Sequence, residues 1–276
     1  MGRKAFKIFN YIFFGLLALV MVYPFWYAFL SSVMPYEDIM GKLLPIIPTS
    51  IDFSAYKQVL EEGILTDAFF VTAASTLIGT VFSMVFTVGG AYVLSKEDLP
   101  GGKIISTVII LTMFFSGGII PMYILLSDLE LTNSFWAYIF PYMLNTIYMF
   151  ILRTSFSEVP KEIKEAAELD GASELRIFVT MYIPLSLPTI LVILFFYLVD
   201  KWNELYIALY YITDYKLCTL QAALYNLLNS SSGSGEMVSE QVKYAAVILT
   251  ILPILLVYPL LQKYFTKGVM LGSVKG

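Results

Sequence analysis

Long apolar runs separated by short polar or charged stretches dominate the pattern of this chain. A helix needs roughly 20 mostly apolar residues to cross the hydrocarbon core of a bilayer, and several runs are about that long. They lie near residues 9–31, 68–94, 104–126, 135–153, 178–200 and 244–264. The pattern therefore predicts an all-α integral membrane protein with six transmembrane helices, one for each of these runs.

A charged stretch at Lys161–Pro188 lies between the fourth and fifth runs. Pro160 before it suits the start of a helix, where a missing N–H costs nothing. Asp170-Gly171 is a turn pair, and Gly171 can adopt a positive φ where this helix ends. Ser173 can cap the next helix. We therefore expect a short amphipathic helix, a turn and a second helix that re-enters the membrane near Pro188.

These residues resemble the EAA loop of ABC importer permeases, here placed at 160–188. The resemblance is carried by Glu165, Ala166, Ala167, Asp170, Gly171, Ala172, Phe178, Ile183, Pro184 and Pro188, with Met181 where isoleucine is usual. It implies the type I permease fold, in which a cytoplasmic coupling helix docks into a groove of an ATPase subunit. The ATPase-coupling residues would then be Glu165, Ala166, Ala167, Asp170, Gly171 and Ala172, with the two alanines allowing close approach. The alternative is an ordinary amphipathic surface helix between two spans.

Composition agrees with a membrane protein: 58% of the 276 residues are hydrophobic and only 14% are charged. A soluble domain this apolar would aggregate, and a net charge of −4 gives no support for nucleic-acid binding. The chain has no histidine and a single cysteine, Cys218, which removes the commonest general base and any internal disulfide. It also has no glycine-rich Walker loop. We therefore expect no catalysis, metal site or bound cofactor in this chain; the resemblance places ATP and Mg on partner ATPase subunits.

Basic residues predict the orientation, because cytoplasmic loops carry an excess of lysine and arginine. With the N-terminus inside, 12 of the 17 basic residues lie on cytoplasmic segments. The five on the outside are Lys42, Lys57, Lys201, Lys216 and Lys243. Both termini and the stretch at 160–188 are therefore expected to be cytoplasmic. The first apolar run is longer than the core of a signal peptide, so we interpret it as a retained span.

Two spans carry small residues that allow alternative interpretations. The second span has Ser75, Gly79, Ser83, Thr87 and Ala91 at every fourth position. That stripe favours close helix packing, either within this chain or against a partner permease. The third span is interrupted by Gly117-Gly118 and Pro121, which indicates a kink or a substrate site.

Four polar or aromatic residues are candidates for the translocation pathway. Asn145 lies in the fourth span, where its amide needs a partner inside the bundle. Trp202, Asn203 and Glu204 at the end of the fifth span resemble the Trp-Asn-acid element of carbohydrate permeases. The alternative for these three is an interfacial aromatic anchor with ordinary polar neighbours.

The C-terminal residues resemble the end of the second permease in maltose-type importers, especially a subgroup for polysaccharides or complex oligosaccharides. That resemblance implies a tail that docks between ATPase subunits, with Gly268, Gly272 and Lys275 as candidate docking residues. The expected organisation is an N-terminal helix and outer loop at 1–67, a five-helix permease core at 68–267 and a cytoplasmic tail at 268–276.

The predicted function is that of a permease subunit of a binding-protein-dependent ABC importer for carbohydrate. The expected solute is an oligosaccharide, and the expected location is the bacterial cytoplasmic membrane. The implied partners are a second permease, two ATPase subunits and an extracytoplasmic solute-binding protein. Two alternatives are an ABC permease for another solute and an ATPase-independent channel or secondary transporter. The latter would need ionisable residues buried in the membrane, and none lies clearly within a predicted span.

Overall fold

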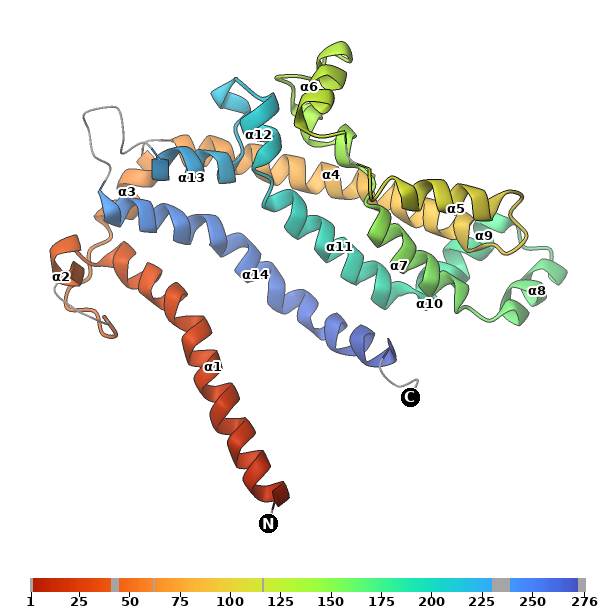
Figure 1. Cartoon of the computed structure of the whole chain (residues 1–276), viewed down its shortest axis with the longest axis horizontal. Helices are drawn as coiled ribbons and strands as arrows, with labels where there is room; N and C mark the ends of the chain where they lie inside the picture. Colours follow the sequence, from red (N-terminus) through yellow and green to blue (C-terminus); the bar gives the residue numbers. More distant parts are fainter. Residues whose placement is uncertain (1, 41–44, 62, 116, 230–238, 273–276) are drawn as a thin grey trace. The chain divides into compact units, whose positions relative to one another are not determined.

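The computed structural model describes residues 2–40, 45–61, 63–115, 117–229 and 239–272, and their regular secondary structure is helical (Figure 1). The chain divides into two compact units. One contains Met1–Asp67 and Ala223–Pro253, and the other contains Ala68–Ala222 and Ile254–Gly276. The second unit includes the whole stretch at 160–188 and the broken spans described below.

The first unit is organised around the end of helix α1 (Gly2–Val33), which is followed by α2 (Tyr36–Met40) and α3 (Ser54–Glu61). Its apolar core consists of Leu30, Val33, Met34 and Ile39, with Tyr27 and Tyr56 packed against it. The hydroxyl groups of Ser32 and Tyr56 are hydrogen-bonded at 2.6 Å. The first predicted span is therefore a continuous helix, and the outer loop packs on its end.

The second unit contains most of the helices. Its elements are α4 (Ile64–Ser95, which starts at the boundary), α5 (Gly102–Leu111), α6 (Ile119–Asp128), η1 (Phe135–Tyr138), η2 (Phe140–Tyr142), α7 (Thr146–Ser157), α8 (Lys161–Leu169), α9 (Glu174–Ile177), the π-helix η3 (Phe178–Tyr182), α10 (Ile183–Leu185), α11 (Leu187–Trp202), α12 (Tyr206–Tyr211) and η4 (Tyr215–Leu217). Helices α13 (Leu220–Asn229) and α14 (Glu240–Gly272) each extend across a boundary between the units.

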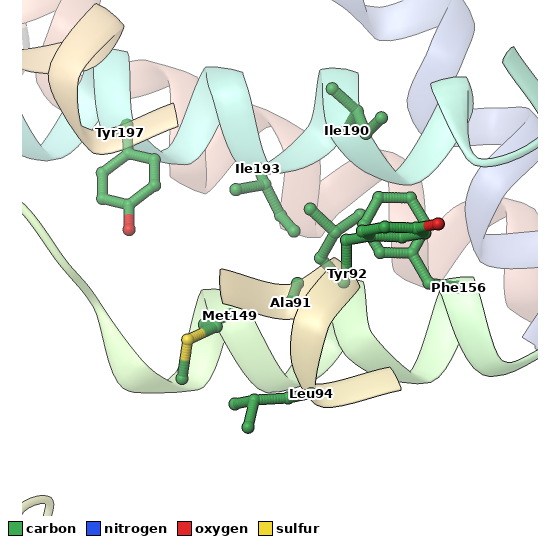
Figure 2. Packing of buried hydrophobic residues seen from close by; sticks show 9 residues of the cluster. Ala91, Tyr92, Leu94, Met149, Phe156, Ile190, Ile193 and Tyr197 are labelled. Atoms are coloured by element: carbon green, nitrogen blue, oxygen red, sulfur yellow. The ribbon is translucent and has the colours of Figure 1, made fainter. Parts of the chain in front are cut away.

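Helices α4, α7 and α11 form the core of the second unit (Figure 2). Met149 and Phe156 of α7 pack with Ile193 and Tyr197 of α11 around Ala91 of α4. All five small residues of the α4 stripe are buried. Because Thr87 Oγ1 is hydrogen-bonded to the Tyr197 hydroxyl at 2.6 Å, this stripe packs within the chain, as the first of the two interpretations predicted.

Three helices are long and apolar enough to span a membrane unbroken: α1, α4 and α14. The fourth and fifth predicted spans are bent pairs, with angles of 49° before α7 and 81° between α10 and α11. The third, at 104–126, is split into α5 and α6, each ten residues long. The described residues therefore offer up to five candidate spans. The glycine pair interrupts the third predicted span, as the sequence indicated, because Gly118, at φ 85° and ψ −177°, cannot continue a helix.

Candidate functional site

Helix α8 begins and ends where its sequence predicts. Pro160 precedes its first residue, Lys161, and Gly171 follows its C-cap with φ 76°. The N–H of Gly171 donates to the carbonyl of Glu168 at 3.0 Å, and the N–H of Ala172 donates to that of Ala167 at 2.9 Å. These two bonds form a Schellman motif, which satisfies the last carbonyls of the helix and requires a left-handed residue. The predicted stop at Gly171 is confirmed.

The chain then turns directly into the helices that lead to α11. Ser173 is the N-cap of α9, and its Oγ accepts a hydrogen bond from the N–H of Arg176 at 3.4 Å. Residues 174–185 form one helical segment that includes the π-helix η3. The 81° bend follows at Ser186, between Pro184 and Pro188. The prediction of a short helix, a turn and a second helix is therefore confirmed.

The predicted coupling residues do not all face the same way. Glu165, Ala166, Asp170 and Gly171 are exposed, and Ala172 is half-buried. Ala167 is buried in this chain. The expectation that both alanines form one open surface is therefore wrong for Ala167, because its methyl group faces inward on an amphipathic helix.

Two exposed leucines beside this helix were missed in the sequence. Leu169, at the end of α8, is 89% exposed, and Leu175, in α9, is 70% exposed. Both side chains are therefore open to a partner surface beside α8. Their only signal in the sequence is an apolar residue within an otherwise charged segment.

Both ends of the loop are tied to the C-terminal end of α4 and the residues that follow it. Glu174 accepts a hydrogen bond from the Tyr92 hydroxyl at 2.6 Å and pairs with Lys96 at 2.5 Å. At the other end, Lys161 pairs with Glu97, and this hydrogen bond raises the pKa of Lys161. These partners lie 64 to 82 residues apart in the chain, so no local pattern predicted them.

Asn145, a candidate for the translocation pathway, is the N-cap of α7. Its Oδ1 accepts hydrogen bonds from the N–H groups of Ile147 and Tyr148 at 3.0 and 3.3 Å. Its own N–H donates to the Tyr197 hydroxyl at 2.9 Å. The predicted need for a partner inside the bundle is met, and the residue marks the bend within the fourth predicted span.

The Trp-Asn-acid element ends α11. Trp202 is buried, with its ring edge-on to Phe69 at 5.8 Å between ring centroids. Asn203 is exposed and donates to the carbonyl of Val199, while Glu204 Oε1 accepts from the N–H of Ile207 at the start of α12. Because the ring packs inside the chain, Trp202 is exposed neither as an interfacial anchor nor as a surface for a solute, whereas Asn203 is exposed.

Lys201 precedes this element and is only 8% exposed. Its Nζ donates to the carbonyls of Tyr138 and Tyr142 at 3.3 and 3.1 Å. Its aliphatic chain lies against Gly79, where an added Cβ would come within 3.2 Å of Cδ. Lys201, which the sequence assigned to an outer segment, is therefore buried in the last turn of α11, just beyond the fifth predicted span. Gly79 is small because this side chain fills the space.

The C-terminal docking residues are only partly described. The backbone of Gly268 and Gly272 belongs to α14, which continues to Gly272, and Lys275 lies outside the described residues. Across the part of the chain that the structure describes, there is no group of three acidic, cysteine or histidine residues that could hold a metal ion.

Known proteins resemble this chain along nearly its whole length. A family model described as "Binding-protein-dependent transport system inner membrane component" matches residues 100–271. The polygalacturonan/rhamnogalacturonan transport system permease protein YtcP of Bacillus subtilis (strain 168) is 36% identical over 100% of both chains. The melibiose/raffinose/stachyose import permease protein MelC of the same strain is 28% identical, covering 92% of this chain and 91% of that protein.

One solved structure extends the likeness to the fold. It is the crystal structure of a bacterial ABC transporter involved in the import of the acidic polysaccharide alginate. Its matching chain aligns with a TM-score of 0.89 and 30% identity, covering 95% of the present chain and 97% of its own. The likeness therefore includes both the loop at 160–188 and the broken spans.

Proposed function

Since this chain belongs to the family of binding-protein-dependent transport system inner membrane components, we propose that it forms half of the membrane pathway of an ABC importer for oligosaccharides. As a multi-pass permease component of the inner membrane it is not itself catalytic. Support for the solute class comes from the names of its relatives, which include a polygalacturonan/rhamnogalacturonan permease and an importer of the acidic polysaccharide alginate. Fragments of acidic polysaccharides are therefore the first solutes to test.

The geometry of α8 is the observation that carries the mechanism. The helix is set off by the Schellman turn at Gly171 and presents Glu165, Ala166 and Asp170 to the exterior. Chain connectivity links it directly to α7 and, through η3, to α11. An ATPase subunit that binds and moves α8 would therefore move the two broken spans. Coupling of this kind is reciprocal, so a loaded binding protein outside should favour ATPase closure inside.

The family implies ATPase and binding-protein partners. The proposal adds a second, different permease chain and two ATPase subunits that hold ATP and Mg. Both termini are assigned to the cytoplasm, and the tail at 268–276 is assigned to the ATPases through Gly268, Gly272 and Lys275. The organisation into an outer N-terminal part at 1–67 and a permease core at 68–267 belongs to the same proposal.

Two substitutions in the loop test this proposal in the assembled complex. Glu165→Lys reverses an exposed charge, and like charges at a docking surface weaken binding. Gly171→Val forces a β-branched residue into φ 76°, at a cost of roughly 1–2 kcal/mol or more, and misdirects the helix. Both complexes should still insert in the membrane, while oligogalacturonide uptake into vesicles and stimulated ATP hydrolysis should fall together.

Gly63→Val is the matched control, because Gly63 has φ 73° and, like Gly171, no atom within 4 Å of an added Cβ. It imposes the same backbone strain far from the loop in sequence. If uptake and ATPase stimulation were at the wild-type level in both loop variants, α8 would not be the coupling element. A loss of uptake with the Gly63 variant as well would attribute the effect to backbone strain alone.

A further inference from the structure

Two broken membrane segments meet around one cleft in the second unit. The cleft has a volume of about 370 Å³ and is lined by residues of the α5–α6 break, α6, η2 and α12. The lining residues are Gly117, Gly118, Ile119, Pro121, Met122, Leu125, Tyr142 and Tyr211. From this geometry, and resting on the proposed function, we infer that the cleft is a saccharide subsite of the pathway, in which the Tyr142 ring stacks on a sugar.

The broken backbone is the first argument for this inference. In a bilayer, irregular backbone is tolerated only where it is buried in protein or lines a water-filled cavity. Residues 112–115 and 117–118 between α5 and α6 are not α-helical, and the bend before α7 lies at residues 143–145. Many transporters place their solute sites at such discontinuous helices. Here Tyr142 lies at one discontinuity and Gly118 at the other, and both line the same cleft.

The chemistry of the lining suits a sugar. Tyr142 is 45% exposed, so part of its ring is available to a ligand. A tyrosine offers an apolar face for the C–H groups of a sugar ring and a hydroxyl for its polar edge. Tyr211 also lines the cleft but is itself buried, and its hydroxyl donates to the carbonyl of Ile119 at 3.4 Å. The volume lies within the range of small-ligand pockets, near its lower end, as expected for one sugar unit.

Lys201 fixes the wall that carries Tyr142. Its ammonium group donates to the carbonyls of Tyr138 and Tyr142, the two residues at which the short helices η1 and η2 end. An ionisable residue buried in a membrane segment is costly and marks functional positions. Because Lys201 holds backbone carbonyls and lies behind the wall, it is a positioning residue for Tyr142.

The region behind Lys201 is also polar. Thr76 and Ser83 lie on the same face of α4 as Gly79, which touches Lys201, and Thr80 is the residue after this glycine. Their hydroxyl groups are buried, and the described residues supply no hydrogen-bond partner for them. Buried hydroxyls normally bond to protein or ordered water, so this side of the pathway is expected to hold water.

Thiol labelling tests the subsite in the full complex with its binding protein and ATPases. Cys218 is the single cysteine of this chain, so Tyr142→Cys in a Cys218→Ser background gives this chain one thiol, and its labelling is followed on this chain. A water-soluble thiol reagent should modify it, and oligogalacturonides with ATP should slow the modification about fivefold. Raffinose serves as a second, uncharged probe. The matched control is Tyr206→Cys, at an exposed α12 tyrosine outside the cleft, whose labelling should not change with either sugar.

Transport measurements separate this inference from the proposed function. Tyr142→Ala should lower uptake per ATP hydrolysed about fivefold, and Tyr142→Phe, which keeps the ring, should lower it less. ATPase stimulation by the loaded binding protein should remain, unlike in the α8 variants. Tyr206→Ala is the control. The subsite is excluded if Tyr142→Cys is not labelled, or if it is labelled equally with and without both sugars. That result would leave the proposed function standing as long as the wild-type complex takes up either sugar. A wild-type complex that takes up neither sugar refutes the proposed solute class instead.

Discussion

The contacts between the loop at 160–188 and the end of α4 allow the stability loss of a Glu174 substitution to be predicted. Glu174 binds two groups, the Lys96 ammonium at 2.5 Å and the Tyr92 hydroxyl at 2.6 Å. The side chains of Lys96 and Glu174 are 26% and 44% exposed, so solvent screens their attraction to about 0.5–1 kcal/mol. The hydrogen bond from Tyr92 to a charged acceptor adds about 1–2 kcal/mol. Glu174→Ala should therefore lower the free energy of unfolding by about 2 kcal/mol.

Glu174→Gln separates the two contributions, because an amide oxygen still accepts from Tyr92 but has lost the charge that attracts Lys96. The expected loss in unfolding free energy is about 1 kcal/mol. Glu97→Gln is the matched control. Its partner is Lys161, and the side chains of Glu97 and Lys161 are 75% and 66% exposed, so solvent screens the pair and the loss should be too small to measure.

A double-mutant cycle gives the decisive measurement. Lys96→Glu and Glu174→Lys should each reduce stability and uptake per ATP hydrolysed, and combining them should restore part of both. Unfolding of the purified permease complex gives the stability, and vesicle uptake with ATPase assays gives the coupling. If the two effects were simply additive, or if Glu174→Gln matched Glu97→Gln in both assays, the C-terminal end of α4 would not transmit the movement of the loop.

Three further predictions concern the bundle, the orientation and the tail. Tyr197→Phe removes a hydroxyl with two buried hydrogen bonds and should lower the free energy of unfolding by about 1–3 kcal/mol, while Tyr215→Phe at an exposed site should not; equal stability of both would contradict the assigned bonds. In a cysteine-free background, an impermeant reagent applied outside should label Ser232→Cys but not Ser95→Cys, and labelling at 95 would overturn the orientation. Deletion of 268–276 should leave membrane insertion intact and alter stimulated ATP hydrolysis, whereas unchanged hydrolysis and uptake would mark the tail as an ordinary terminus.

Elements with local signals were predicted best from the sequence. The stop of α8 depends on Gly171 and its neighbours, and the start of α9 depends on the side chain of Ser173. Both are decided within a few residues, so the sequence contains the whole cause.

Features that depend on distant neighbours could not be read from the chain. Lys201 looked like an outer charge next to Trp202, yet its two acceptors lie 59 and 63 residues earlier. The burial of Trp202 depends on Phe69, more than 130 residues away. The glycine pair at 117–118 signalled an interruption, but not that it would end one helix and start another.

The π-helix at Phe178–Tyr182 sets how α8 and α9 are rotated about the helix axis relative to α10. A π-helical turn bonds residue i to i+5, so this segment accommodates one residue more than an α-helix would. Deleting one residue here would restore α-helical geometry and rotate everything before it by about 100° about the local axis. Leu175 would then point in a different direction relative to α10. A single insertion or deletion at this site would therefore change the direction in which α8 and Leu175 face relative to α10, although the sequence of α8 stays the same.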